Sequence, residues 1–255
     1  MKLGVLSDIH GNKVALDAVL AEGASVGVDR WWALGDLVLM GSRPVEVLET
    51  LRSLPAIDFV GGNTDRYVVT GAQPLAHPTV DRIVGDVDLI RRYAEVAAGI
   101  GWVQGALLDT GLVNWLAELP SEQRLTLSGG ERLLGVHASP AWDDGPGINP
   151  DSSDDEMAAL LGDCDADIVV GGHTHLVTDR RVKGMRVLNP GSVGLPKRGT
   201  DASWMVIETD PNGVHVELRR TPFDTEAALR DVHERRHPGA EYLESMLRGT
   251  HRFAN

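Results

Sequence analysis

Five short apolar segments, each followed closely by aspartate, asparagine or histidine, are the feature that most constrains the fold of this chain. The segments span residues 3–6, 31–34, 57–60, 133–136 and 168–170, and the polar residues after them are Asp8 and His10, Asp36, Asn63, His137, and His173 and His175. Short apolar runs bounded by glycine or polar residues are typical of buried strands. Because sites in open α/β sheets lie outside the carboxyl ends of the strands, the pattern predicts that these side chains meet at one edge.

Helices are predicted between the first three of these strands. Apolar residues recur at helical spacing over residues 16–20, and we expect this helix to stop at Gly23. A second helix is expected from Pro44, a favourable first-turn residue, to Leu54. Strands that alternate with helices in this way predict a layered α/β domain.

The second half of the chain is rich in strand pairs separated by short turns. The pairs are residues 124–127 with 133–136, 177–182 with 185–188, and 203–209 with 214–219. Such hairpins predict a second sheet stacked against the first. One further helix is expected through Leu161, because Ser153 and Glu156 have the spacing of a capping box.

Two segments fall outside the strand pattern. Residues 66–108 begin with a loop and continue with a predicted helix over 79–99, after which Gly99, Gly101 and Gly105 are expected to interrupt regular structure. A helix over 110–119 follows, and the tail is predicted to be helical. We therefore expect one domain over residues 1–255, with a helical insertion at about 66–108 and a helical tail at about 224–255. Both segments are candidate surfaces for a homo-oligomer, although an insertion packed on the domain edge explains the first equally well.

Charge and composition exclude several classes of function. Lys and Arg number 24 against 37 Asp and Glu, a formal net charge of -13, which disfavours binding to a nucleic-acid duplex or an anionic membrane. No apolar run is long enough for a membrane span or a signal peptide, so we predict a cytoplasmic protein. Cys164 is the only cysteine, which excludes an intrachain disulfide and a thiolate cluster.

The residue types after the five strands indicate a metal site. Two carboxylates, one amide and four imidazoles without thiolates suit divalent ions such as Mn²⁺, Fe²⁺, Co²⁺, Ni²⁺ or Zn²⁺. Seven side chains are too many for one tetrahedral ion that keeps an open position, whereas two ions could share them. Taken singly, Asp8 could cap a turn, Asn63 could follow glycine in a turn, and His137 could be a core histidine; the set as a whole favours two metal ions. Two ions about 3.5–4 Å apart form a clamp for displacement at phosphorus.

The ordered motifs resemble those of the calcineurin-like metallophosphoesterases. They are Asp8-x-His10, Gly35-Asp36, Gly62-Asn63, His137 and Gly171-Gly172-His173-x-His175, and the later Asn189-Pro190-Gly191-Ser192-Val193-Gly194 is similar to the YfcE-type phosphodiesterase branch. The resemblance implies a four-layer α-β-β-α sandwich of two mixed sheets. It also implies two divalent ions, of which we favour Mn²⁺. One ion would be held by Asp8, His10, Asp36 and His175, and the other by Asp36 (bridging), Asn63, His137 and His173.

The expected reaction is hydrolysis of a small phosphodiester by a metal-bridging hydroxide, with Asp36, Asn63 and His137 as catalytic residues. A phosphomonoesterase is the alternative, and a non-catalytic protein-interaction scaffold of the same fold is a further one. Many members of this family carry histidine directly after the motif asparagine, where this chain has Thr64, a poor proton donor at neutral pH. Candidate phosphate contacts are Arg66, Lys197 and Arg198.

Overall fold

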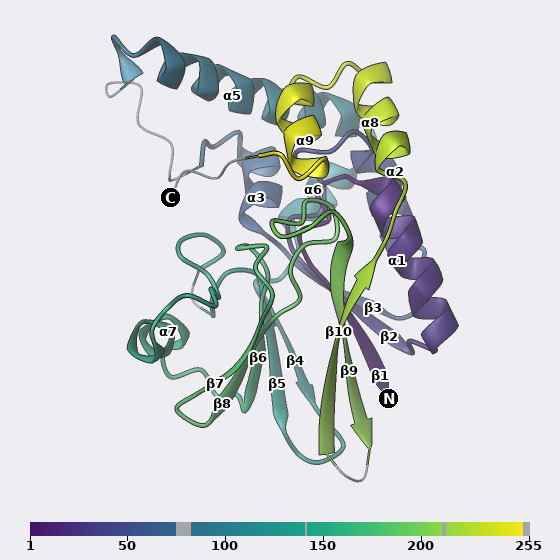
Figure 1. Cartoon of the computed structure of the whole chain (residues 1–255), viewed down its shortest axis with the longest axis vertical. Coiled ribbons are helices and arrows are strands. Elements are labelled where there is room, and N and C mark those ends of the chain that lie inside the picture. Colours follow the sequence, from purple (N-terminus) through teal and green to yellow (C-terminus); the bar gives the residue numbers. More distant parts are fainter. Residues whose placement is uncertain (75–82, 141, 211–212, 252–255) are drawn as a thin grey trace.

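Two sheets packed face to face form the centre of the computed structural model (Figure 1). The structure describes residues 1–74, 83–140, 142–210 and 213–251. The first sheet has the strand order β10 (Gly213–Thr221), β9 (Ala202–Asp210), β1 (Lys2–Leu6), β2 (Arg30–Leu34) and β3 (Ile57–Val60). The second sheet has the order β4 (Glu122–Thr126), β5 (Arg132–Val136), β6 (Ile168–Val170), β8 (Met185–Asn189) and β7 (Thr178–Val182).

Each sheet is mixed and contains three neighbouring parallel strands. In the first sheet β1, β2 and β3 are parallel, and in the second β5, β6 and β8 are parallel. The register pairs Leu6 with Ala33 and Leu34 with Val60, so the loops that follow these strands begin side by side. Strands β9, β4 and β7 run antiparallel to their neighbours.

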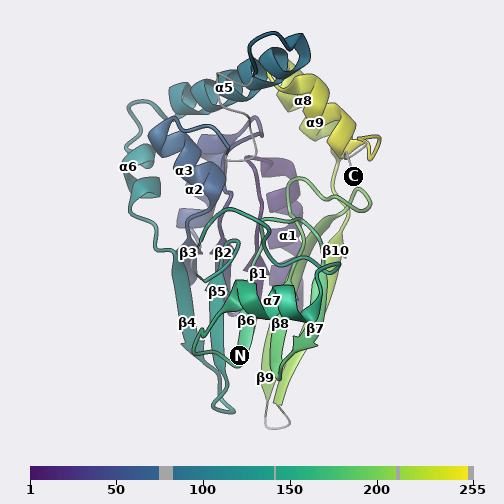
Figure 2. The ribbon, with the colours of Figure 1, turned by 90° about the vertical axis from the view of Figure 1, so that its left-hand side faces the viewer.

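Apolar side chains fill the space between the sheets and cover both outer faces. The cluster between the sheets includes Leu3, Trp32, Leu133 and Ile168. On the outer face of the first sheet lie α1 (Lys13–Val26), α2 (Pro44–Arg52), α3 (Asn63–Thr70), α5 (Val87–Leu107) and α6 (Leu112–Ala117). On the outer face of the second lies α7 (Asp154–Leu161), visible in front of that sheet in Figure 2. The expected four-layer α-β-β-α sandwich of two mixed sheets is confirmed.

The first predicted helix is longer than expected. Helix α1 continues through Gly23 and ends at Gly27, which has a left-handed backbone with φ of 73°. The ring of Trp31 packs directly against Gly23 within the helix. A Cβ at this residue would lie 2.4 Å from that ring, so only glycine fits there. The prediction that Gly23 stops the helix was wrong, since this glycine serves the contact with Trp31. Helix α2 begins at Pro44 as expected and ends at Arg52.

The segment before residue 108 also differs from expectation. Helix α3 covers Asn63–Thr70 and ends at Gly71, and α5 covers Val87–Leu107, so that the three glycines expected to interrupt the chain lie within a helix. This helix tolerates them because Ile100, Val103 and Leu107 are buried in the core, which outweighs a cost of about 1 kcal/mol per glycine. Residues 79–82 of the predicted helix lie outside the described residues.

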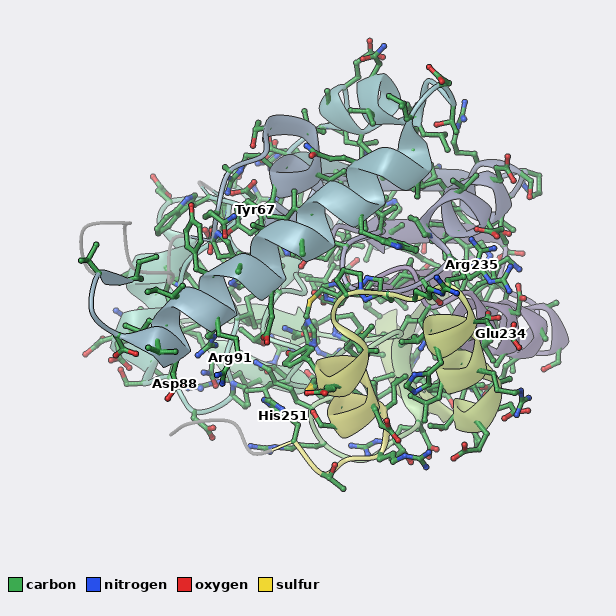
Figure 3. The ribbon with its side chains drawn as sticks, turned by 90° about the horizontal axis from the view of Figure 1, so that it is seen from above. Tyr67, Asp88, Arg91, Glu234, Arg235 and His251 are labelled. Atoms are coloured by element: carbon green, nitrogen blue, oxygen red, sulfur yellow. The ribbon has the colours of Figure 1, made fainter. Side chains whose placement is uncertain are left out.

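The hairpins and the helical tail occur as predicted, but only the first two hairpins lie in the second sheet. The expectation that the third also lies there was wrong: β9 pairs with β1, so the pair β9 and β10 extends the first sheet. The antiparallel pairs are β4 with β5, β7 with β8, and β9 with β10. Helix α7 begins with the capping box of Ser153 and Glu156. The tail forms two helices, α8 (Thr225–Glu234) and α9 (Ala240–Leu247), which share a small apolar cluster with Leu195. Seen from above, these helices lie beside α5 (Figure 3). Within the described residues no helix has the length and apolarity needed to cross a membrane.

Candidate metal centre

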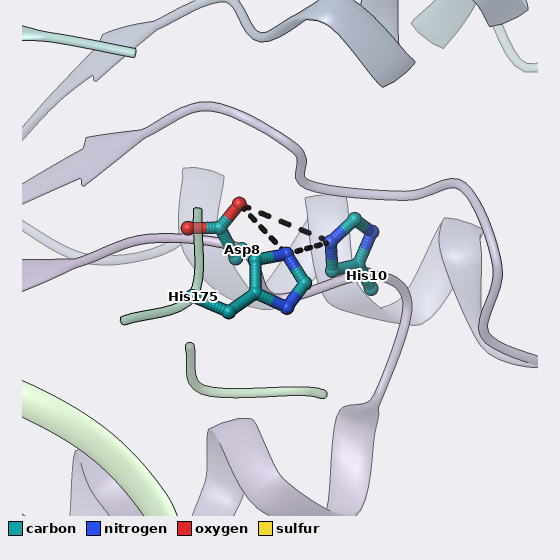
Figure 4. A group of neighbouring side chains, drawn as sticks. All are labelled: Asp8, His10 and His175. Carbon is teal, nitrogen blue, oxygen red and sulfur yellow. Dashed lines mark hydrogen bonds and ion pairs between the residues drawn. The ribbon is translucent and has the colours of Figure 1, made fainter. Parts of the chain in front are cut away.

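Six of the seven candidate ligands come together in two clusters at the carboxyl ends of the strands. The first cluster consists of Asp8, His10 and His175, and the second consists of Asp36, His137 and His173. Within each cluster the three candidate ligand atoms lie within 4.8 Å of one another. Figure 4 shows the first cluster, in which the two imidazoles and the carboxylate turn toward a common point. The seventh residue, Asn63, contacts the second cluster.

The backbone at these positions is unusual. Nine non-glycine residues in the described part of the chain have positive φ, and five of them are candidate ligands: Asp8, His10, Asp36, His173 and His175. A left-handed conformation costs a non-glycine residue roughly 1–3 kcal/mol and persists only where the surrounding structure fixes it. Strain of this kind gathers at functional sites, which marks these two clusters.

Hydrogen bonds to main-chain carbonyls fix the tautomers in the first cluster. The Nδ1 of His10 donates to the carbonyl of Leu39 at 2.9 Å, and the Nδ1 of His175 donates to that of Leu195 at 2.8 Å. Since carbonyl oxygens only accept, the Nε2 atoms of the neutral rings carry lone pairs. Those atoms are 3.1 Å apart, and Asp8 Oδ1 is 3.2 Å from Nε2 of His175. Three acceptors this close repel one another unless a positive charge lies between them.

In the second cluster, too, one ring nitrogen of each histidine donates to a main-chain carbonyl. The Nδ1 of His137 donates to the carbonyl of Leu34 at 2.7 Å, and the Nε2 of His173 donates to that of Gly145 at 2.9 Å. The remaining nitrogens of both rings face Asn63 Oδ1, at 3.0 Å from His137 and 2.9 Å from His173. The Nε2 of His137 is also 3.3 Å from Asp36 Oδ1. Lone pairs again converge on one point, so this donor set fits a divalent cation.

Asp36 lies between the two clusters. Its Oδ1 accepts a hydrogen bond from the backbone N–H of Thr64 at 2.9 Å and faces His137, whereas its Oδ2 is 3.7 Å from Nε2 of His10 in the first cluster. This one carboxylate therefore faces both clusters. The side chain is buried, so its charge must be compensated locally.

Electrostatics favour positive charge at both clusters. Burial alone would raise the pKa of Asp8, but His175 and His137 outweigh it and hold that pKa below its usual range; His137 and His10 do the same for the pKa of Asp36. Burial would lower the pKa of His137, but Asp36 outweighs it and raises that pKa to about 10. Burial lowers the pKa of His10 and that of His173. A proton on His137 is one form of the cation that the carboxylates stabilise, and a metal ion is another.

Two polar residues that the sequence analysis missed hold the carboxylates in place. Asp65 accepts hydrogen bonds from the backbone N–H groups of Leu37 at 2.9 Å and Gly62 at 3.0 Å, and so ties together the loops of Asp36 and Asn63. Burial and then the charge of Asp36 raise the pKa of Asp65 to about 7. Its spacing of three residues from Gly62 is that of an acid that caps a helix, a signal that could have identified it. Ser7 has no comparable signal; its hydroxyl donates to Asp8 Oδ2 at 2.6 Å.

The Asn189–Gly194 motif supports the loops from behind. The amide of Asn189 donates to the carbonyl of Gly172 at 2.7 Å, next to His173. The hydroxyl of Ser192 donates to the carbonyl of Asp8 at 2.8 Å. Both side chains are fully buried. The motif therefore links the histidine loop after β6 to the aspartate loop after β1.

The three candidate phosphate contacts lie in different surroundings. Lys197 is close to the first cluster: burial lowers its pKa, and the charge of Asp8 opposes that shift. Arg66 donates two hydrogen bonds to Asp143, at 2.7 and 2.9 Å, and lines a cavity that reaches His137. Arg198 is 67% exposed and lies 3.7 Å from Asp151, which belongs to neither cluster. The structure thus brings Lys197 and Arg66, but not Arg198, to the candidate centre.

Thr64 contributes its backbone to the centre. Its N–H donates to Asp36, while its buried hydroxyl oxygen has no hydrogen-bond partner among the described residues. A hydroxyl enclosed in this way is not exposed to a leaving group. The position therefore does not replace the histidine that many related sequences carry.

Comparisons with known proteins agree with this geometry. Residues 1–212 match the Calcineurin-like phosphoesterase superfamily domain. An uncharacterized protein of Methanocaldococcus jannaschii is 27% identical over 256 residues, which cover 92% of this chain and 93% of that protein. Phosphodiesterase YfcE of Escherichia coli strain K12 is 27% identical over 219 residues, 82% of this chain and 89% of that protein.

Two solved structures share the fold. One is a metallophosphoesterase from Sphaerobacter thermophilus, with a TM-score of 0.73 and 24% identity over 98% of this chain and 99% of that one. The other is a hypothetical protein from Pyrococcus horikoshii OT3, with a TM-score of 0.78 and 22% identity over 96% of this chain and 97% of that one. The match over residues 1–212 confirms the resemblance drawn from the motifs. The chain belongs to the calcineurin-like phosphoesterase superfamily.

Proposed function

We propose that this protein is a dinuclear metal-dependent phosphodiesterase. The observation that carries the proposal is the convergence of acceptor atoms in two clusters on either side of Asp36. With Nδ1 of His10 and His175 donating to carbonyl groups, the facing Nε2 atoms have no hydrogen-bond donor among the described residues. A metal cation at each cluster would bind these lone pairs and remove the repulsion between them. Bound metal ions also agree with membership of a phosphoesterase family.

The residues would divide between two ions around the shared carboxylate. Asp8, His10 and His175 would hold one ion, Asn63, His137 and His173 the other, and Asp36 would bridge them. Bound divalent ions lower the pKa of a water between them and offset charge on phosphate oxygens. Oxygen and nitrogen donors without sulfur make Mn²⁺ the ion that we favour. Lys197, which interacts with Asp8, and Arg66, which lines a cavity with His137, are the cations that we expect to contact anionic oxygens of the substrate.

A diester is favoured over a monoester by two observations. The similarity to Phosphodiesterase YfcE extends over 82% of the chain. In addition, a cavity beside the second cluster offers room for an organic group on the phosphate, and a diester has two such groups. The enclosed hydroxyl of Thr64 supplies no proton to a departing alkoxide, so we expect a preference for esters with good leaving groups.

The test compares bis-p-nitrophenyl phosphate with p-nitrophenyl phosphate after the protein is freed of metal and reloaded with Mn²⁺, Co²⁺, Ni²⁺, Fe²⁺ or Zn²⁺. We expect two equivalents of Mn²⁺ per chain and faster turnover of the diester. Asp36→Asn should lower kcat/KM by more than about 100-fold, because even outer partners of metal ligands are worth about 10–100-fold. Asp17→Asn, an exposed acid on α1, is the matched control and should retain full activity.

Each other result points to one of the alternatives. Faster hydrolysis of the monoester would identify a phosphomonoesterase. A protein that takes up no metal and turns over neither ester would support an interaction scaffold. Full diesterase activity in metal-loaded Asp36→Asn would refute the bridging role.

A further inference from the structure

A cavity of about 510 Å³ lies beside the second cluster. It is open to the surface and bordered by α3, by the C-terminal part of α6 with the residues after it, and by the segment that follows β5; its walls include Gly62 and His137. This volume is within the range of about 300–1,000 Å³ in which proteins bind small organic molecules. A phosphate held at the metal centre would therefore have one of its ester groups at the mouth of this space.

The walls of the cavity suit an organic group. Val69 on α3, Leu116 on α6, and Leu119, Pro120 and Pro140 in the loops provide apolar surface. Arg66 adds one cation to this wall; its guanidinium is held over the ring of Tyr67 at 5.0 Å and by Asp143. The cavity thus combines a mostly apolar surface with a fixed positive charge near the phosphate.

Trp142 is an exposed aromatic side chain on this cavity. It is 49% exposed, although tryptophan is one of the most highly buried residue types on average. Its backbone is fixed by reciprocal hydrogen bonds with Ser139, 3.0 and 3.3 Å long, and the hydroxyl of Ser139 donates to the carbonyl of Trp142 at 3.1 Å. These bonds hold the backbone of Trp142, five residues after His137, against that of Ser139.

The indole also has a direct structural link to the metal centre. Its ring packs on Gly145, where a Cβ atom would lie 2.7 Å from the ring. The carbonyl of the same Gly145 accepts the hydrogen bond from Nε2 of His173. One residue therefore supports both the tryptophan and a candidate metal ligand, which fixes the ring next to the second cluster.

We propose that the cavity binds the aromatic ester group of a phosphodiester, stacked on Trp142, and that a nucleoside is the natural form of this group. The inference rests on the proposed phosphodiesterase function and specifies its substrate class. A planar ring gains most from an exposed indole, because stacking of a base on an aromatic side chain contributes about 1–3 kcal/mol. The volume accommodates a sugar as well as a base, which favours a nucleoside over a bare aryl group.

The test measures competition by three diesters against hydrolysis of bis-p-nitrophenyl phosphate by the Mn²⁺-loaded enzyme. The competitors are thymidine 5′-methyl phosphate, phenyl methyl phosphate and diethyl phosphate, which share one phosphodiester charge and differ in the organic group. We expect the thymidine ester to have the lowest inhibition constant. Trp142→Ala should raise this constant about 5- to 150-fold and change that of diethyl phosphate by less than about twofold.

Two further variants make the result specific to the ring. Trp142→Phe retains an aromatic face and should keep most of the affinity for the thymidine ester. Leu108→Ala removes another exposed apolar side chain, 69% exposed at the end of α5, and should change none of the inhibition constants. Near-equal constants for the phenyl and thymidine esters would overturn the nucleoside assignment in favour of an aryl diester.

The inference and the proposed function fail in different ways. If Trp142→Ala hydrolyses bis-p-nitrophenyl phosphate and binds the thymidine ester as tightly as the wild-type protein, the stacking site is refuted and the phosphodiesterase stands. If the wild-type protein hydrolyses no diester with any metal, the proposed function itself is refuted.

Discussion

Gly62→Ala is expected to disrupt the metal centre without touching a ligand. Gly62 has φ of −103° and ψ of 172°, an extended conformation that any residue can adopt, so its requirement for glycine is steric. A Cβ at this position would lie 2.3 Å from Oδ1 of Asp36 and 2.4 Å from its backbone nitrogen. The added methyl group therefore collides with the residue that faces both clusters.

The size of the effect follows from these distances. Non-bonded heavy atoms approach favourably at about 3.5 Å or more, so Asp36 and residue 62 must separate by roughly 1 Å. One colliding atom belongs to the backbone, so rotation of a side chain cannot relieve the contact. Overpacking of this kind costs about 1–3 kcal/mol. The shift also lengthens the bond from Thr64 N–H to Asp36, 2.9 Å in the native protein, and hydrogen bonds to charged groups contribute about 1.5–3 kcal/mol.

We therefore expect the free energy of unfolding of the metal-free protein to fall by at least about 2 kcal/mol, measured by urea denaturation. The affinity for Mn²⁺, measured by titration calorimetry, should fall about 10–100-fold, the usual effect of displacing a partner of a metal ligand. The adjacent Gly61→Ala is the matched control. Its nearest neighbour would be Cβ of Leu119 at 3.3 Å, which a small shift relieves.

The reasoning would be refuted by a Gly62→Ala protein that binds Mn²⁺ like the wild type and unfolds within about 0.5 kcal/mol of Gly61→Ala. Such a result would mean that the loops after β2 and β3 separate at no cost. Equal losses of stability and of Mn²⁺ affinity in both variants would show that any side chain in this turn has the effect, whether or not it collides with Asp36.

Three further outcomes are expected. His175→Ala should lose or weaken one ion and His173→Ala the other, so that metal analysis finds about one tightly bound equivalent in each; loss of both ions from either variant would contradict two separable clusters. Burial lowers the pKa of His237 to about 4, below its unfolded value near 6.5, so the unfolded chain binds the proton first and stability falls as pH decreases from about 6.5 to 4, by up to about 3 kcal/mol. Urea unfolding at pH 5 and 7 should show a smaller loss for His237→Phe, which keeps the ring contact with Trp102, and equal losses would contradict the assignment. Ser192→Ala removes the hydroxyl that accepts from the N–H of Leu195 in a buried site, while the carbonyl of Asp8 still accepts from the N–H of Gly194 at 2.9 Å; the change should cost about 1–3 kcal/mol, whereas the exposed Ser25→Ala should stay within about 0.5 kcal/mol, and the same urea measurement decides whether the two variants differ.

The residues of the candidate centre were predictable because their signals are local. A short apolar run followed by a polar residue indicates a strand and its end, and each of Asp8, Asp36, Asn63 and His137 follows such a run. The edge of the sheet then brings them together, since β1, β2 and β3 are parallel and so are β5 and β6. The same local reasoning mistook Gly23 for a helix end, because the ring of Trp31 that requires this glycine packs there only in the folded chain.

The chemistry of the centre was decided by contacts between residues far apart in the sequence. Which nitrogen of His10 carries the proton depends on the carbonyl of Leu39, 29 residues away, and its distance to His175 spans 165 residues. The role of Asp65, the steric need for Gly62 and the exposure of Trp142 beside the cavity likewise follow from neighbours that no periodicity brings together. The sequence by itself determined which donors are present and at which strand ends. Only the tertiary structure decided where their lone pairs point, because the tautomers and close approaches are set by backbone groups from other parts of the chain.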